Sequence, residues 1–131
     1  MSTADELQAR IDAIEESYEF FLAYAAQGLA SDQRSKSGGQ LRQFLGQMES
    51  GLAGLGAELG TVVSEAGSEP VAAWADLVDV VTRDANAALA AVTLVAARPE
   101  ISSQLIDNLN ANIHLRALLT DLFLVDELID G

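Results

Sequence analysis

The sequence predicts an all-α protein, an antiparallel up-down-up-down four-helix bundle. Apolar or small residues recur at intervals of three and four along most of the chain, which is the spacing of one face of a helix. The two prolines, Pro70 and Pro99, both fall where this spacing is interrupted. The four resulting stretches have similar lengths, and short connections make consecutive helices antiparallel. We therefore expect residues 1–131 to form a single domain, with helices at roughly 3–30, 40–66, 69–97 and 100–129.

The first predicted helix, 3–30, opens with a capping-box pattern. Thr3 is expected to cap the helix, and Glu6 to reach back to the backbone of the cap. The apolar seam then continues through Leu7, Ile11, Ile14, Tyr18, Phe21 and Ala25. The polar segment 31–40 contains two consecutive glycines and interrupts the seam, so it predicts a mobile loop.

The second predicted helix, 40–66, combines a leucine seam with an unusual number of glycines. The glycines are Gly46, Gly51, Gly54, Gly56 and Gly60. Each glycine inside a helix costs about 1 kcal/mol relative to alanine. They indicate either that another helix approaches closely here or that this helix is locally soft. We favour close approach, because the leucine seam continues past all five positions.

The third predicted helix, 69–97, follows a stop signal at Gly67 and a start signal at Pro70. Its first half has a polar face, and its second half is rich in alanine and nearly free of polar residues. We therefore expect the second half to contact protein on almost every side. The fourth helix, 100–129, begins after Pro99.

The fourth predicted helix carries apolar residues on more than one face. The stripe of its first part is displaced by roughly 90° from the stripe of its second part on a regular helical wheel. Either the helix is kinked or bulged near His114, the only histidine in the chain, or it uses two faces. The second part also keeps a separate apolar arc of Ala117, Leu124 and Leu128.

Extra apolar surface on a small bundle is typical of a subunit interface. We therefore predict a homodimer, with a contact formed by the fourth helix and the alanine-rich half of the third. The predicted interface residues are Ala117, Leu124 and Leu128, with His114 and Asp121 beside them.

Composition and charge exclude several function classes. The net charge of −13 opposes binding to phosphate backbones and to anionic membranes, so we expect no nucleic-acid and no membrane partner. The same charge favours a basic protein partner. Without cysteine there is no disulfide, thiolate metal site or cysteine nucleophile. The chain starts with no signal-peptide pattern, so we expect a cytoplasmic protein.

One acidic motif suggests metal chemistry. Glu15, Glu16 and Glu19 are spaced as EExxE, which resembles the magnesium-binding motif of the all-α nucleoside-triphosphate pyrophosphatases. The resemblance implies that these carboxylates hold Mg²⁺ against substrate phosphates. The family's second motif, ExxD, occurs here only at Glu127–Asp130, near the end of the chain. A histidine-assisted di-iron site is not expected, because Ala111 stands where such a site needs glutamate three residues before His114.

The prediction that best fits these features is a non-enzymatic, acidic helical-bundle protein. It would act by binding other proteins in a regulatory, adaptor or assembly role, as a homodimer and without a cofactor. The first alternative is a small metal-dependent enzyme that uses the helix-one carboxylates. The second is a bundle that holds an apolar ligand beneath the glycine-rich second helix.

Overall fold

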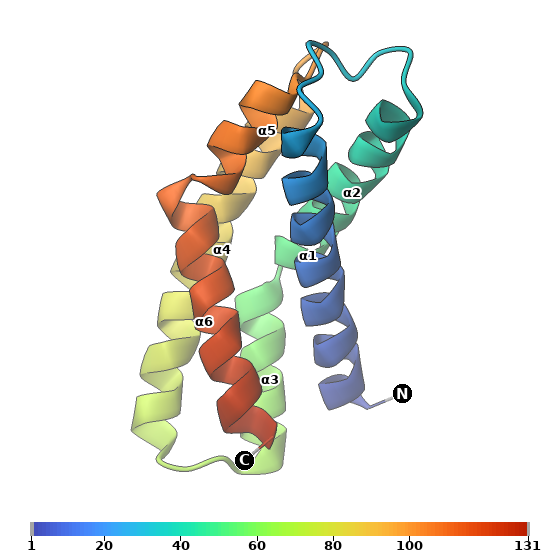
Figure 1. Cartoon of the computed structure of the whole chain (residues 1–131). Helices are drawn as coiled ribbons and strands as arrows, with labels where there is room; N and C mark the ends of the chain where they lie inside the picture. Colours follow the sequence, from blue (N-terminus) through green and yellow to red (C-terminus); the bar gives the residue numbers. More distant parts are fainter. Residues whose placement is uncertain (1, 131) are drawn as a thin grey trace.

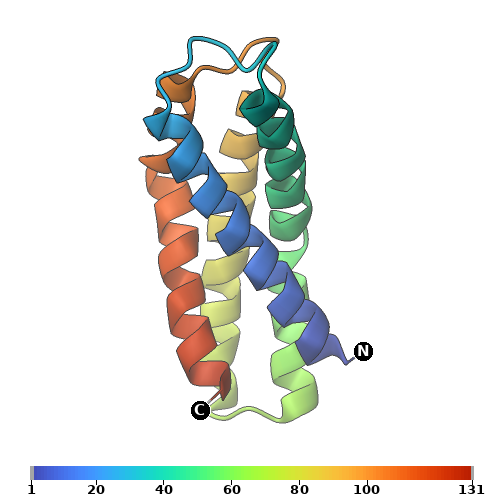
Figure 2. The ribbon, with the colours of Figure 1, turned by 45° about the vertical axis from the view of Figure 1, so that its right-hand side comes forward.

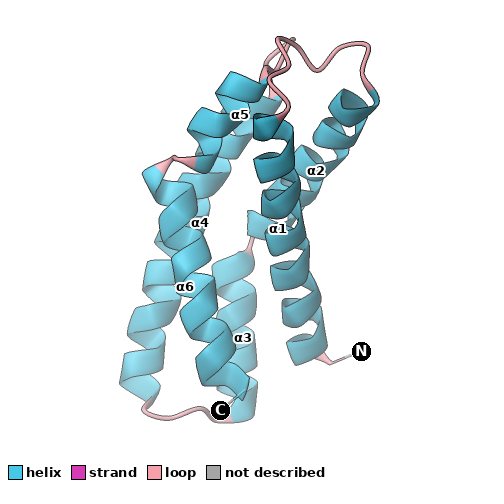
Figure 3. Cartoon of the chain, viewed as in Figure 1, coloured by secondary structure: helices cyan, strands magenta, loops and turns pink. Residues whose placement is uncertain are grey.

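The computed structural model describes residues 2–130, and all of its regular structure is helical (Figure 3). The prediction of an all-α fold is confirmed. Within the described residues there are six helices rather than four. They are α1 (Thr3–Ala26), α2 (Lys36–Leu52), α3 (Leu55–Ala66), α4 (Val71–Ala96), α5 (Ser103–Asn110) and α6 (Ile113–Asp130).

The helices lie lengthwise in an elongated molecule (Figure 1). The chain ascends through α1, descends through α2 and then α3, ascends through α4, and descends again through α5 and α6. The start of α1 and the end of α6 therefore lie at the same end of the molecule. Two of the predicted helices, 40–66 and 100–129, are each divided into two pieces.

The start of α1 differs from the prediction by one residue. Ser2, and not Thr3, is the cap: its hydroxyl accepts a hydrogen bond from the backbone N–H of Asp5 at 3.1 Å. Asp5, and not Glu6, returns the bond to the cap backbone. The helix ends at Ala26, earlier than predicted, and Gly28 has a φ of 66°, which is outside the helical range.

The connection between the first two helices lies at 27–35 and not at the predicted 31–40, because α1 ends at Ala26 and α2 already begins at Lys36. The hydroxyl of Ser35 caps this helix by accepting a hydrogen bond from the N–H of Gly38 at 2.8 Å. A Cβ atom at Gly38 would lie 1.7 Å from the carbonyl oxygen of Asp32. Glycine therefore lets the start of α2 pack directly on the loop that leads into it.

The buried carboxylate of Asp32 holds the loop against the C-terminal end of α4. Asp32 accepts hydrogen bonds from Nε of Arg42 at 2.8 Å and from the N–H of Ile101 at 2.7 Å. Arg42 also donates to the carbonyl oxygens of Ala96 and Arg98, at 2.8 and 2.9 Å. Although burial opposes ionisation, the bonds from Arg42 and Ile101 hold the pKa of Asp32 below its ordinary value.

The predicted second helix is broken at Gly54, which has a left-handed φ of 76°. Arg10 of α1 spans the break. Its Nη1 donates to the carbonyl oxygens of Ser50 and Gly51 at the end of α2. Its Nε lies 2.6 Å from a carboxylate oxygen of Glu58 in α3. Arg10 therefore satisfies carbonyls that the break leaves without helical partners, and it holds the two pieces together.

Close helix packing explains two of the other glycines. A Cβ atom at Gly51 would lie 2.6 Å from Cγ1 of Ile14, and one at Gly56 would lie 1.8 Å from Oγ1 of Thr82. A Cβ atom at Gly46 would meet nothing within 4 Å. The prediction of close approach is confirmed at Gly51 and Gly56, whereas Gly54 marks a break in the helix.

Alanine substitutions should separate these roles. We expect Gly56→Ala to lower the free energy of unfolding by about 2 kcal/mol, because Thr82 and its backbone must move to admit a methyl group. Gly46→Ala is the matched control, and it should raise stability by about 0.5–1 kcal/mol through helix propensity alone. Urea denaturation of both variants measures the difference. Equal effects at the two positions would contradict the close α3–α4 contact.

The predicted fourth helix is broken between α5 and α6. The side-chain oxygen of Asn112 accepts hydrogen bonds from the N–H groups of His114 and Leu115, at 3.0 and 3.2 Å. These bonds make Asn112 the cap of α6. The kink predicted near His114 is therefore confirmed, and it accounts for the displacement of the apolar stripe between the two pieces.

The core lies between the helices and is almost entirely aliphatic. Its largest fully buried side chains are Tyr24, Phe21, Ile11, Ile14, Leu41, Leu45, Met48, Leu52, Leu55, Leu59, Ile101 and Ile106. α1 packs mainly on α2, α5 and α3, whereas α6 packs mainly on α4. Figure 2 shows α1 crossing the molecule obliquely, so it diverges from α6 toward its N-terminal end. This divergence leaves one side of α6 open.

Candidate functional site

Among residues 2–130, α6 carries more exposed large hydrophobic side chains than any other helix. Four of the seven large hydrophobic side chains that are exposed lie on this helix: Ile113 at 73 %, Phe123 at 62 %, Leu124 at 50 % and Leu128 at 46 %. Of the predicted interface residues, Leu124 and Leu128 are thus exposed, and Ala117 is half-buried. We call Ile113, Ala117, Leu124 and Leu128 the α6 stripe.

The two polar residues predicted beside this surface are differently placed. His114 is exposed in the first turn of α6. Asp121 is half-buried, and its carboxyl group is directed to α4, where it hydrogen-bonds the carboxyl group of Asp84. The structure therefore gives Asp121 a partner on another helix and not the histidine two turns before it.

Asp84 and Asp121 form a carboxyl pair between α4 and α6. Burial, the hydrogen bond with Asp84 and the charge of Asp84 raise the pKa of Asp121 to about 7. Oδ2 of Asp121 is buried and accepts no hydrogen bond from the described residues. A carboxylate in such a place is costly, so near neutral pH this pair holds a shared proton for part of the time.

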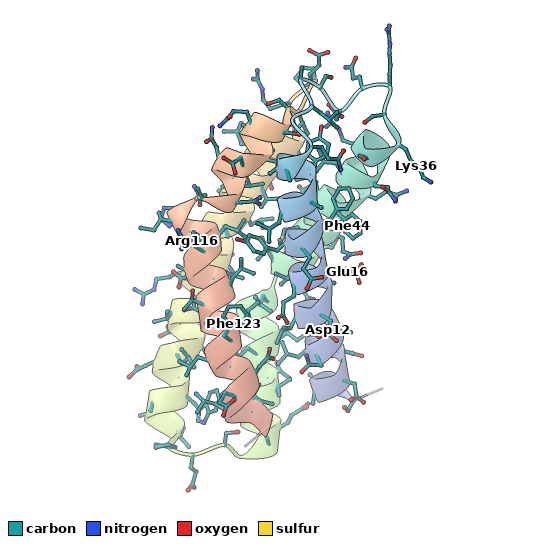
Figure 4. The ribbon with its side chains drawn as sticks, in the orientation of Figure 1. Asp12, Glu16, Lys36, Phe44, Arg116 and Phe123 are labelled. Carbon is teal, nitrogen blue, oxygen red and sulfur yellow. The ribbon has the colours of Figure 1, made fainter. Side chains whose placement is uncertain are left out.

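The carboxylates of the EExxE motif point to two sides of α1. Glu15 and Glu19 face α6, whereas Glu16 accepts a hydrogen bond from the side chain of Gln47 in α2 at 3.3 Å. Figure 4 shows Glu16 and Asp12 on α1, with Arg116 and Phe123 on α6. No group of three metal-capable side chains occurs among residues 2–130. The structure thus does not bring the three glutamates together.

A groove separates α1 from α6 and has a volume of about 330 Å³. α1 contributes Glu15, Tyr18 and Glu19 to its lining. α6 contributes Arg116, Leu119, Thr120 and Phe123. Leu119 is buried and Tyr18 is half-buried, whereas Phe123 stands exposed at the edge. We call this feature the α1–α6 groove.

The electrostatic field of the groove is negative on its α1 side. Burial raises the pKa of Glu15, and the charges of Asp126, Asp12 and Glu19 raise it further. Four acidic groups therefore lie in or near the groove, and its lining contains one basic side chain, Arg116. A cation entering the groove would relieve this repulsion.

A second hollow, of about 360 Å³, lies between α3 and α4. Its apolar lining includes Val63, Val71 and Val78, together with Gly60 and Gly67. It lies beside the second piece of the glycine-rich segment, where the sequence suggested an apolar ligand. The hollow opens at the surface, since Val71 is 70 % exposed.

Sequence reasoning missed three residues of these sites. Asp84 was visible as part of a polar face on the third helix, but its partner could not be identified without the register between two helices. Arg116 and Phe123 lie off the α6 stripe, and only the oblique path of α1 exposes them to a groove. The available signal in the sequence was Phe123, an aromatic residue in an otherwise leucine-rich helix.

None of the helices in residues 2–130 is long and apolar enough to cross a bilayer. Comparisons with known protein families, with curated proteins and with solved structures found no match to this chain.

Proposed function

We propose that this protein is a non-enzymatic interaction module that forms a homodimer through the α6 stripe. The observation that carries the proposal is the exposure of Ile113, Leu124 and Leu128 on one face of a helix whose opposite face is buried. The four residues of the stripe lie within roughly 60° of one another on a helical wheel. A continuous apolar face of this kind is stabilised when another helix covers it.

The spacing of the stripe is self-complementary for an antiparallel pair. If a second α6 is reversed about a point between Thr120 and Asp121, Ile113 meets Leu128 and Ala117 meets Leu124 of the second copy. Each large side chain thus meets an apolar partner, and the small Ala117 leaves room for Leu124. A two-fold symmetric contact of this kind closes on itself, so it yields a dimer and not a filament.

Charges beside the stripe support the same arrangement. Arg116 and Glu127 lie on the same flank of α6, and in an antiparallel pair this flank faces its own copy. Each Arg116 would then approach Glu127 of the other copy, which gives two ion pairs by symmetry. Complementary charges of this kind fix register more than they add affinity.

The six helices can be described as four antiparallel segments. We propose that α2 with α3, and α5 with α6, each take the place of one helix in an up-down-up-down four-helix bundle. The ascending and descending path of the chain supports this description.

We also propose a cytoplasmic location and a regulatory, adaptor or assembly role. Both suit an acidic surface that carries the apolar α6 stripe.

Analytical ultracentrifugation over a concentration series tests the dimer. A contact between two single helices is small, so we expect a dissociation constant in the micromolar range. Leu124→Glu should weaken association by at least about tenfold, because it places a charge in the apolar contact of each copy. Since Leu124 is half exposed, the variant should fold like the wild type.

Two controls make the test specific. Val71→Glu introduces the same charge at a side chain that is 70 % exposed on α4, and it should leave association unchanged. Arg116→Glu and Glu127→Arg should each weaken the dimer, whereas the double variant should restore it. A wild-type protein that stays monomeric at hundreds of micromolar would refute the proposal, and so would equal effects of Val71→Glu and Leu124→Glu.

A further inference from the structure

The α1–α6 groove is distinct from the α6 stripe. Phe123 and Leu119, which line the groove, lie on the flank of α6 that faces α1, and the stripe faces away from the bundle. Both surfaces can therefore be occupied at the same time. The groove exists because α1 packs on α2, α3 and α5 and crosses the bundle obliquely (Figure 2).

The groove offers an apolar wall opposite an acidic one. Phe123 is 62 % exposed at the α6 edge, and Leu22, one turn beyond Glu19 on α1, is 48 % exposed. The lining from α1 includes the carboxylates of Glu15 and Glu19, which are one helical turn apart. Two carboxylates at this spacing can share the donors of one guanidinium or ammonium group.

The volume limits what can enter. About 330 Å³ is at the lower end of the range for pockets that enclose a whole small molecule. It suffices for one long side chain. The stem of an arginine or lysine would cover Leu119 and the ring of Phe123 or Tyr18, and its charged end would reach the glutamates. Aromatic rings attract such cations, so the apolar and acidic walls act together.

The negative charge around the groove favours a positively charged partner. Glu15 already lies in the field of Asp12, Glu19 and Asp126, and the chain as a whole carries −13. A segment with one basic side chain for Glu15 and Glu19 and with apolar neighbours for Leu22 and Phe123 would match these groups.

We propose that the α1–α6 groove is a docking site for a basic, amphipathic segment of another protein, which inserts an arginine or lysine side chain between Glu15 and Glu19. The segment's apolar residues pack on Leu22 and Phe123. This site is independent of the dimer contact, and the α6 stripe stays free while the groove is filled.

A synthetic amphipathic peptide of leucine and arginine, about four helical turns long, provides the probe. Fluorescence anisotropy should show binding that falls by at least about tenfold in Glu15→Gln/Glu19→Gln. The control Glu65→Gln/Glu69→Gln removes the same charge from two exposed positions, one in the last turn of α3 and one in the connection to α4, and its affinity should stay within about twofold of the wild type. Phe123→Ala should weaken binding in the same assay, and the thermal melting of each variant reports its fold.

The remaining outcomes decide against the proposal. Equal losses in the two glutamine double variants would assign the binding to net charge. Equal affinity for a peptide with glutamine in place of arginine would remove the role of the cation. If spermidine binds at the same glutamates as tightly as the peptide, the occupant is a free polyamine and not a protein segment. A wild-type protein that binds none of these probes would exclude the site.

Discussion

At pH 8, Asp121→Asn is expected to stabilise the protein by about 3 kcal/mol. The physical reason is the raised pKa of Asp121, about 7 in the folded protein against an ordinary value of 3.8. A shift of this size corresponds to about 4 kcal/mol, and we reduce it because the side chain is partly exposed and solvent screens the charge. Asparagine cannot ionise, and it can donate a hydrogen bond to Asp84.

The sign of the pH dependence follows from the same pKa values. Below pH 3.8, Asp121 is protonated in both the folded and the unfolded chain, and its ionisation contributes nothing to stability. Between pH 3.8 and about 7 the unfolded chain releases the proton while the folded chain retains it. Folding is therefore penalised increasingly as the pH rises, and the penalty is complete above pH 7. The advantage of Asp121→Asn should grow across this window and then stay constant.

Denaturant unfolding at pH 4, 6 and 8 measures this effect. Asp79→Asn is the matched control, since it removes one aspartate from an exposed position of α4. It should change stability by less than about 0.5 kcal/mol at any of these pH values. A gain for Asp121→Asn that is the same at pH 4 and pH 8 would contradict the carboxyl pair.

The second large effect is expected at the other end of the molecule, where Arg42→Met should destabilise the protein by about 3 kcal/mol. The substitution leaves the carboxylate of Asp32, of which 6 % is exposed, without its ion-pair partner. It also removes the donor that serves the carbonyl oxygens of Ala96 and Arg98. Breaking a buried pair costs about 3–5 kcal/mol, and the lower value applies because 36 % of the Arg42 side chain is exposed.

A double-mutant cycle checks the origin of this loss. Asp32→Asn/Arg42→Met should be more stable than Arg42→Met alone, because no buried charge is then left unpaired. Arg83→Met, at an exposed position of α4, should be nearly neutral. Since the pKa of Asp32 is lowered by folding, its contribution is present above its ordinary pKa and is lost as the pH falls through the folded value. Additive losses in the cycle would exclude the ion pair as the cause.

The periodicity of the sequence predicted the helical segments and the exposed arc of α6, but it could not predict both helix breaks equally well. Side chains on either side of Gly54 remain on the core face, so the leucine seam continues across the break and hides it. The glycine at this position looks the same in the sequence as Gly46, which lies inside a regular helix. The difference comes from Arg10, which binds the carbonyl oxygens that the break exposes.

The break before α6 left a clearer signal. The stripe displacement indicated it, and Asn112 is a residue type that commonly caps helices. The candidate sites depend on a different kind of information. Asp84 meets Asp121, and Glu15 faces Arg116, only because of the register and tilt between helices that are far apart in the chain. No local pattern encodes these two quantities, so neither the carboxyl pair nor the groove could be predicted from the sequence.

The cap at Asn112 also makes α6 rotationally independent of the helix before it. In an unbroken helix, every inserted residue turns all later side chains by about 100° about the axis. Here the hydrogen bonds from the first turn of α6 to Asn112 set the starting angle anew. The direction of the α6 stripe is therefore set by the packing of the buried face of α6 on α4 and not by the rotation of α5. The exposed surface of this protein can thus vary in evolution separately from the core contacts that α5 makes with α1.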